Sequence, residues 1–188
     1  MSTRLECVAP EDAVRLGKEF GITEAQAGRS AFRMLAHHPD LVKHVYALLT
    51  MLSTRNKLPT RLRELMIMRL AWVTGAEYAW FQHYRISTQA GVTPEEIVAV
   101  RDWHKSDLFS PADRAVLAAA DDTRENGKIS DAVWAECEKQ LKEPALLVEM
   151  VVAIGNWTMF SQLLQSLRVP LEEGGVPWPP DGKAPAAS

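Results

Sequence analysis

One stretch near the C-terminus, ALLVEMVVAIGNWTMFSQLLQSL, constrains the fold of this chain most. It follows Pro144, a residue typical of a first helical turn, and its apolar side chains fall almost all round a helix. In a soluble protein such a helix must lie in the core or in a subunit interface. The stretch therefore predicts a central helix, or two helices broken near Gly155, with other elements packed around it.

The rest of the chain supplies those elements as further helices. From Ile22 onward the apolar spacing is helical, and no segment alternates with a period of two between hairpin turns. TPEE at Thr93 is a capping box with proline at the first helical position, and SPAD at Ser110 opens a helix in the same manner. The expected helices run from near Pro39 to before Asn56, from near Pro59 to Thr74, from Ala76 to Gly91, from Thr93 onward, from Ser110 to Gly127, and after Ser130. We therefore predict an all-α fold.

The domain organisation follows from length and from the composition of the tail. A chain of 188 residues favours one domain with a substantial core. We assign residues 1–170 to a helical domain and residues 171–188 to a C-terminal arm, because the latter are too rich in proline and glycine to hold a helix. Trp178 in this arm would either dock on the domain or a neighbouring chain, or remain in solvent.

Composition and charge narrow the possible partners. The sequence is 47% apolar and 24% charged with a net charge of -3, so it lacks the basic excess of nucleic-acid-binding proteins. It contains no run of eighteen apolar residues and no secretory signal at its start, so we expect no membrane partner and a cytoplasmic location. Cys7 and Cys137 form neither a CxxC pair nor a zinc spacing, which suits a reducing compartment.

Glu64 is the first candidate for chemistry, because it sits in an apolar part of its predicted helix. Its neighbours at plus three and plus four are Ile67 and Met68. If that side faces the core, burial raises the pKa of the carboxyl and makes it a proton donor or acceptor near neutral pH. The structural alternative is that Glu64 complements the helix dipole or pairs with Arg61, and that RLRE is otherwise a solvated face.

His83 is the second candidate, at the end of GAEYAWFQH. It shares a helical stripe with Ala76 and Ala79, whose small side chains leave space above the helix for a ligand. The alternative is a buried histidine with one satisfied nitrogen. Tyr78, Gln82 and Arg85 flank the stripe and could supply polar contacts or face solvent.

A metal site is not expected. His37 and His44 lie seven residues apart, but Pro39 interrupts the helix between them, and neither they nor His38 match an established ligand spacing. The sequence also contains no glycine-rich phosphate loop, nucleophile elbow or kinase signature. We therefore predict neither a metal nor a cofactor.

The segment LPTRLRELMIMRLAWVTGAEYAWFQHYRISTQAGVTPEEIVAV resembles the central module of the carboxymuconolactone decarboxylase family, which includes the alkylhydroperoxidase D-like proteins. The later pattern from FSPADRAVLAAADDT to the last apolar stretch resembles the longer members. The resemblance implies an alkylhydroperoxidase D-like helical bundle that assembles as a homo-oligomer, a trimer or a hexamer. In the peroxidase branch the motif carries a CxxC pair, and its glutamate and histidine form a proton relay. Glu64 and His83 match these two relay residues, but Ala76 and Ala79 occupy the cysteine positions here.

The loss of both cysteines removes thiol-based peroxide reduction, because no thiolate is left at that site to attack a peroxide. The resemblance then implies a cofactor-free decarboxylase or lyase acting on a small lactone-type or keto acid. His83 would donate a proton to the carbanion and Glu64 would orient it, while Tyr78, Trp80 and Arg85 would contact the substrate. The alternative is a non-catalytic homo-oligomer of the same fold that binds a small molecule or serves a structural role.

Overall fold

The computed structural model describes residues 3–186, and within them every regular element is a helix. The prediction of an all-α fold is therefore confirmed. The elements are α1 Pro10–Glu19, α2 Glu24–Ala27, α3 Ser30–Leu35, α4 Pro39–Thr54, α5 Thr60–Thr74, α6 Glu77–Gln89, α7 Pro94–Ala99, the 3-10 helix η1 Val100–Lys105, α8 Pro111–Asn126, α9 Asp131–Leu141 and α10 Pro144–Leu167.

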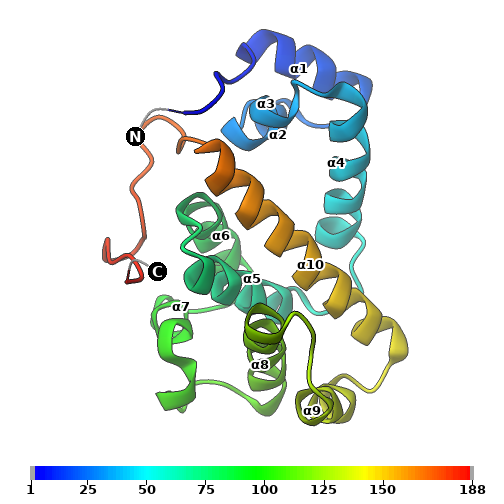
Figure 1. Ribbon diagram of the computed structural model, residues 1–188, viewed down its shortest axis with the longest axis vertical. Helices are drawn as coiled ribbons and strands as arrows, with labels where there is room; N and C mark the ends of the chain where they lie inside the picture. The colour runs from blue at the N-terminus through cyan, green and yellow to red at the C-terminus, as the bar shows by residue number, and fades with distance from the viewer. Residues whose placement is uncertain (1–2, 187–188) are drawn as a thin grey trace.

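Helix α10 crosses the molecule diagonally, with α1 to α4 on one side and α5 to α9 on the other (Figure 1). It continues through Gly155 without a break. By length and composition it could cross a membrane, but residues such as Met150, Ile154 and Trp157 are buried against the neighbouring helices, as in the central helix of a soluble fold. Val148, Val151, Val152 and Met159 remain exposed on its outer face.

The predicted caps account for several helix boundaries. The capping boxes at Thr93 and Ser110 form, and Gly75 ends α5 in the left-handed region with φ of 68°. This sharp turn lets α6 fold back on α5. Pro59 precedes α5 as its N-cap, one position earlier than a first-turn residue.

Helix α1 lies in a segment for which the sequence predicted no helix. Its fully buried residues, Ala13 and Gly17, are small, and Val14 and Leu16 pack partly buried against the core. Gly17 is needed for close packing, because a Cβ there would lie 2.7 Å from the Cβ of Ala27. The helix is therefore held by close backbone approach together with these partly buried side chains.

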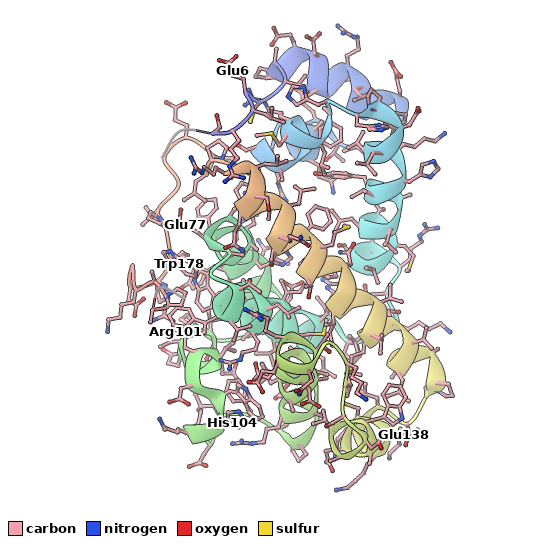
Figure 2. All side chains as sticks on the ribbon, in the orientation of Figure 1. Glu6, Glu77, Arg101, His104, Glu138 and Trp178 are labelled. Carbon is pink, nitrogen blue, oxygen red and sulfur yellow. The ribbon has the colours of Figure 1, made fainter. Side chains whose placement is uncertain are left out.

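The C-terminal arm packs on its own domain. Trp178 is only 6% exposed and its ring lies 5.8 Å from those of Trp72 and Trp80, while Trp80 donates its indole N–H to the carbonyl of Pro179. Arg101 binds both carboxylate oxygens of Asp181 at 2.8 Å. Figure 2 shows Trp178 and Arg101 on the same flank of the molecule. Of the alternatives for Trp178, the structure shows docking on the domain.

Candidate active site

Glu64, near the start of α5, and His83, in the middle of α6, meet where the two helices pack against each other. Glu64 is fully buried, and its Oε2 lies 2.7 Å from Nδ1 of His83. The two helices run back to back from Gly75, so residues placed on their facing sides come together although they are separated in sequence. The sequence analysis singled out both residues, and the structure shows that they form one hydrogen-bonded pair.

Arg63 holds the other oxygen of the same carboxylate. Its Nε and Nη2 donate to Oε1 of Glu64 at 3.0 and 2.8 Å, and its Nη1 donates to the carbonyl of Leu52. The side chain is 4% exposed, so the prediction that RLRE is otherwise a solvated face is wrong for Arg63. The alternative pairing of Glu64 with Arg61 is also wrong, because Arg61 binds Glu96 and Asp113 instead.

Burial and ionic contacts act in opposite directions on Glu64. Burial opposes ionisation, but the interactions with His83 and with the Arg63 guanidinium outweigh it and hold the pKa of Glu64 below its ordinary value. This corrects the prediction of a raised pKa, which considered the apolar neighbours without the buried arginine. Glu64 is therefore a carboxylate at neutral pH and can accept the Nδ1 proton of His83.

The second nitrogen of His83 faces Trp157 on α10. The indole Nε1 lies 3.1 Å from Nε2 of His83. An indole N–H can only donate, so Nε2 must offer its lone pair, and the single ring proton lies on Nδ1 toward Glu64. In this arrangement His83 is a neutral imidazole whose Nε2 lone pair accepts the Trp157 N–H. It can take a proton from a substrate, and so become the expected proton donor, only when a ligand displaces this hydrogen bond.

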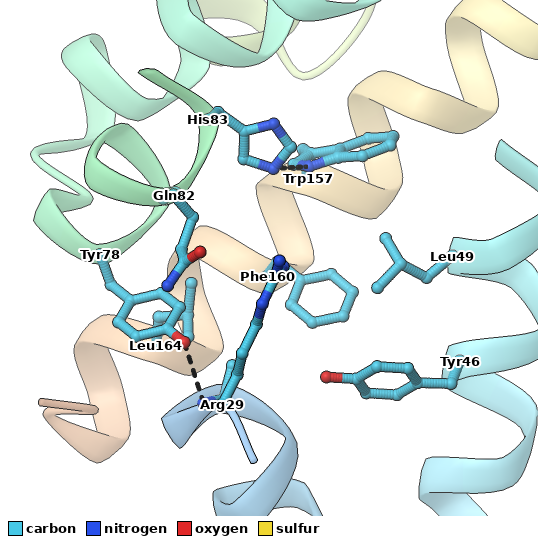
Figure 3. A pocket seen from close by; sticks show the side chains of 11 residues that line it. Arg29, Tyr46, Leu49, Tyr78, Gln82, His83, Trp157, Phe160 and Leu164 are labelled. Carbon is cyan, nitrogen blue, oxygen red and sulfur yellow. Dashed lines mark hydrogen bonds between the residues drawn. The ribbon is translucent and has the colours of Figure 1, made fainter. Parts of the chain in front are cut away.

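A cavity of about 80 Å³ lies beside this nitrogen (Figure 3). Leu49, Trp157, Phe160 and Leu164 form apolar walls, and the polar side chains come from α4, α6 and the turn before α3. The lining residues are Arg29, Ala31, Tyr46, Leu49, Tyr78, Ala79, Gln82, His83, Trp157, Phe160 and Leu164. A proton-accepting nitrogen therefore borders a mostly apolar space, as in many small-molecule sites.

Of the predicted substrate contacts, only Tyr78 lines this cavity. Trp80 is fully buried beneath Trp178 and the arm, so the structure does not place it at the cavity. Arg85 borders a different surface hollow, between α6 and the arm, because it projects from another side of the helix than His83. These two placements correct the predicted contacts of Trp80 and Arg85.

The C-terminal arm contacts the cavity through Glu172. Its carboxylate accepts hydrogen bonds from the Tyr78 hydroxyl and the Gln82 amide, both at 2.5 Å, and from the backbone N–H of Ser30 at 3.1 Å. Burial, followed by this contact with Glu172, raises the pKa of Tyr78, so its hydroxyl stays protonated. The arm was not predicted to take part in the site, because its sequence shows only proline and glycine enrichment.

Arg29 and Tyr46 are cavity residues that the sequence analysis missed. Arg29 sits between two short helices, and Tyr46 lies on an otherwise ordinary amphipathic helix, α4. Neither stands in a motif. Only the tertiary packing of α3 and α4 against α6 and α10 brings them to His83.

The alanines at the cysteine positions of the peroxidase branch lie at the start of α6, where Ala79 lines the cavity. Cys7 and Cys137 pack in different apolar clusters. Burial raises the pKa of Cys7, and it raises that of Cys137 to about 11, so both remain thiols at neutral pH. Neither cysteine lines the cavity beside His83.

The histidines considered for a metal have local structural roles. Nε2 of His37 lies 2.7 Å from the carbonyl of Glu6, and Nδ1 of His38 accepts the N–H of Leu41 at the start of α4. Within residues 3–186 no group of three or more histidine, cysteine, aspartate or glutamate side chains is arranged to hold a metal ion.

The family model of the carboxymuconolactone decarboxylase family matches residues 39–122, which run from α4 into α8 and include both Glu64 and His83. The predicted resemblance to the carboxymuconolactone decarboxylase family is therefore confirmed for this segment. A comparison with curated protein sequences gives no significant match.

Solved structures show how far the similarity of the fold extends along the chain. Debrominase Bmp8 in its apo form has a TM-score of 0.75 at 18% identity, covering 92% of this chain and 94% of its own, and a cysteine-to-alanine variant of it is known in complex with 2,3,4-tribromopyrrole. An uncharacterised peroxidase-related protein from Ralstonia eutropha JMP134 with an alkylhydroperoxidase AhpD core has a TM-score of 0.74 at 14% identity, covering 91% and 93%. A protein of unknown function from Agrobacterium tumefaciens, for which an AhpD antioxidant role has been suggested, has a TM-score of 0.67 at 21% identity, covering 72% and 93%. The predicted alkylhydroperoxidase D-like fold is therefore confirmed.

Proposed function

We propose that this protein is a cofactor-free acid–base decarboxylase or lyase that acts on a small keto acid or lactone-type acid. The observation that carries the proposal is the chain of contacts Arg63–Glu64–His83, which ends with Nε2 of His83 at the cavity. A carboxylate bound to Nδ1–H fixes the ring orientation and stabilises the imidazolium that forms during proton transfer.

The proposed reaction uses His83 first as a base and then as an acid. When the substrate displaces the Trp157 N–H, Nε2 accepts the acidic proton of the substrate carboxyl group, and the resulting imidazolium is stabilised by Glu64. The bond to the departing carboxyl carbon then breaks, carbon dioxide leaves, and the electron pair remains as an enolate. The Nε2 proton passes to the enolate carbon, which returns His83 to its neutral form.

The apolar walls support this reaction type. When a carboxylate loses carbon dioxide, the neutral gas departs and the negative charge moves to the enolate. An apolar environment around the departing group therefore disfavours the starting carboxylate. Trp157 and Phe160 provide such surroundings next to His83. Thiol peroxidase chemistry has no comparable support, because alanines occupy the two cysteine positions and the existing thiols have raised pKa values.

A panel of β-keto acids and unsaturated lactone acids, assayed by release of carbon dioxide, tests the proposal. On any substrate that is turned over, His83→Asn should lower kcat about 10²-fold or more, the usual contribution of a general acid–base group. Glu64→Gln should lower it at least about tenfold for the same reason. His104→Asn, at an exposed histidine, is the matched control and should leave turnover unchanged.

If His83→Asn and the parent turn over substrate equally well, the catalytic assignment fails. If the panel yields no turnover at all, the non-catalytic binding protein becomes the better description. Peroxide reduction that depends on a dithiol would contradict the exclusion of thiol chemistry.

We also propose that the chain acts in the cytoplasm as a homo-oligomer, a trimer or a hexamer. The exposed apolar residues on the outer face of α10 support burial against a second copy. Light scattering on the purified chain measures this directly, and the mass of a single chain at all concentrations would contradict it.

A further inference from the structure

Arg29 brings a positive charge to the cavity that no acidic side chain neutralises. Its side chain lines the cavity, and within residues 3–186 it has neither an ion-pair partner nor a side-chain hydrogen bond. Four other arginines, Arg61, Arg63, Arg69 and Arg101, each bind a carboxylate. A guanidinium that faces a partly apolar space without a counter-ion favours the binding of an anion there.

The acidic residue of the arm does not supply that counter-ion. Glu172 lies at the same site, but its two oxygens accept hydrogen bonds from Ser30, Tyr78 and Gln82. It makes no ion pair with Arg29 within 4.0 Å. The Glu172 carboxylate therefore holds Tyr78 and Gln82 in the cavity wall, and the Arg29 guanidinium remains available to a ligand.

Tyr46 places a hydroxyl on the same part of the cavity. Its ring packs edge-on against Phe32 at 4.8 Å, which fixes its direction. Burial raises the pKa of Tyr46 although the charge of Arg29 acts against this, so the hydroxyl stays protonated and can donate. Figure 3 shows the Tyr46 hydroxyl pointing into the cavity and the Arg29 guanidinium reaching toward its centre.

We propose that Arg29 and Tyr46 form a carboxylate-binding subsite, and that the ligand is a small, flat, unsaturated acid lying between Leu49 and Phe160. The planar guanidinium can bind two carboxylate oxygens in parallel, and the phenol adds a third donor. The rest of the ligand extends along the apolar walls toward Nε2 of His83.

The size and direction of the site limit the ligand further. A cavity of about 150 Å³ accommodates benzene, so about 80 Å³ restricts the ligand to small acids of at most roughly four carbons. A carboxylate held by Arg29 is stabilised as an ion and is retained in the reaction, so a substrate that loses carbon dioxide must carry a second carboxyl group near His83. The bond that changes lies at the His83 end of the molecule, an assignment that rests on the proposed function, whereas the subsite itself does not.

Binding of crotonate, compared with its neutral analogue crotonamide, tests the subsite by NMR titration or calorimetry on the intact chain. The parent should bind crotonate at least tenfold more tightly than crotonamide. Arg29→Gln should weaken crotonate binding at least tenfold and leave crotonamide unchanged, while Tyr46→Phe should weaken crotonate several-fold. Arg85→Gln is the matched control, because Arg85 lies outside the cavity, and should bind crotonate like the parent.

Equal binding of crotonate and crotonamide by the parent, no crotonate binding at millimolar concentration, or unchanged binding in a folded Arg29→Gln variant would each overturn the subsite. His83→Asn separates this inference from the proposed function. It should retain crotonate binding within about threefold even if the protein proves to have no decarboxylase activity, because the anchor is Arg29.

Discussion

Two carboxylates contact residues that line the cavity, and their surroundings differ. Glu64 lies on a rigid central helix between a buried guanidinium and an imidazole, whereas Glu172 lies on the C-terminal arm and accepts hydrogen bonds from uncharged donors. The first arrangement can take part in proton transfer, because its histidine partner can change its protonation state. The second holds Tyr78 and Gln82 in place. The comparison indicates that the neighbours of a carboxylate, more than its burial, decide its role.

The largest expected effect comes from removing the cation beside Glu64. Arg63→Ala should destabilise the protein by about 3–5 kcal/mol, because it leaves a buried carboxylate without its ion-pair partner. Denaturant unfolding of the variant and the parent measures this loss. A loss below about 1 kcal/mol, the range of exposed ion pairs, would show that Glu64 does not depend on Arg63.

A smaller effect is expected at the arm. Glu172→Gln keeps the shape of the side chain but weakens its hydrogen bonds to Tyr78 and Gln82, so it should cost about 1–3 kcal/mol of unfolding free energy. Glu173→Gln is the neighbouring control on the same arm. If the two variants are equally stable, the arm does not hold the cavity wall through Glu172.

The pH dependence of stability should distinguish Glu64 from an ordinary surface carboxylate. Its pKa in the folded protein lies below the unfolded value of 4.5, so its ionic contribution is fully present above pH 4.5 and is lost as the pH falls through the lower folded value. The stability difference between the parent and Glu64→Gln should therefore shrink on acidification from pH 6. A difference that grows at acidic pH would contradict the lowered pKa.

The sequence predicted the helices whose large side chains follow a regular spacing or whose ends carry caps, such as α4 and α8. It missed α1, a helix of ten residues whose fully buried residues, Ala13 and Gly17, are small. It also identified Glu64 and His83 by their neighbours and by the family resemblance. Their contact required knowledge of how α5 and α6 pack.

The remaining cavity residues illustrate what sequence patterns omit. Arg63 lies on a helix that is buried between two apolar clusters, so no solvated face exists on which its charge could be placed. Arg29 and Glu172 come from a turn and from the arm, where no periodicity applies. The helical pattern places Arg85 on the side that flanks the His83 stripe, but in the structure Arg85 borders the hollow next to the arm.

The central claim is that Glu64 and Trp157 hold His83 as a neutral imidazole with its proton on Nδ1. Nitrogen-15 NMR on histidine-labelled protein at neutral pH tests it most directly, because the two ring nitrogens have different shifts when protonated and unprotonated. For the signal that disappears in His83→Asn, the account predicts a protonated Nδ1 and an unprotonated Nε2. A proton on Nε2, or protons on both nitrogens, would contradict it.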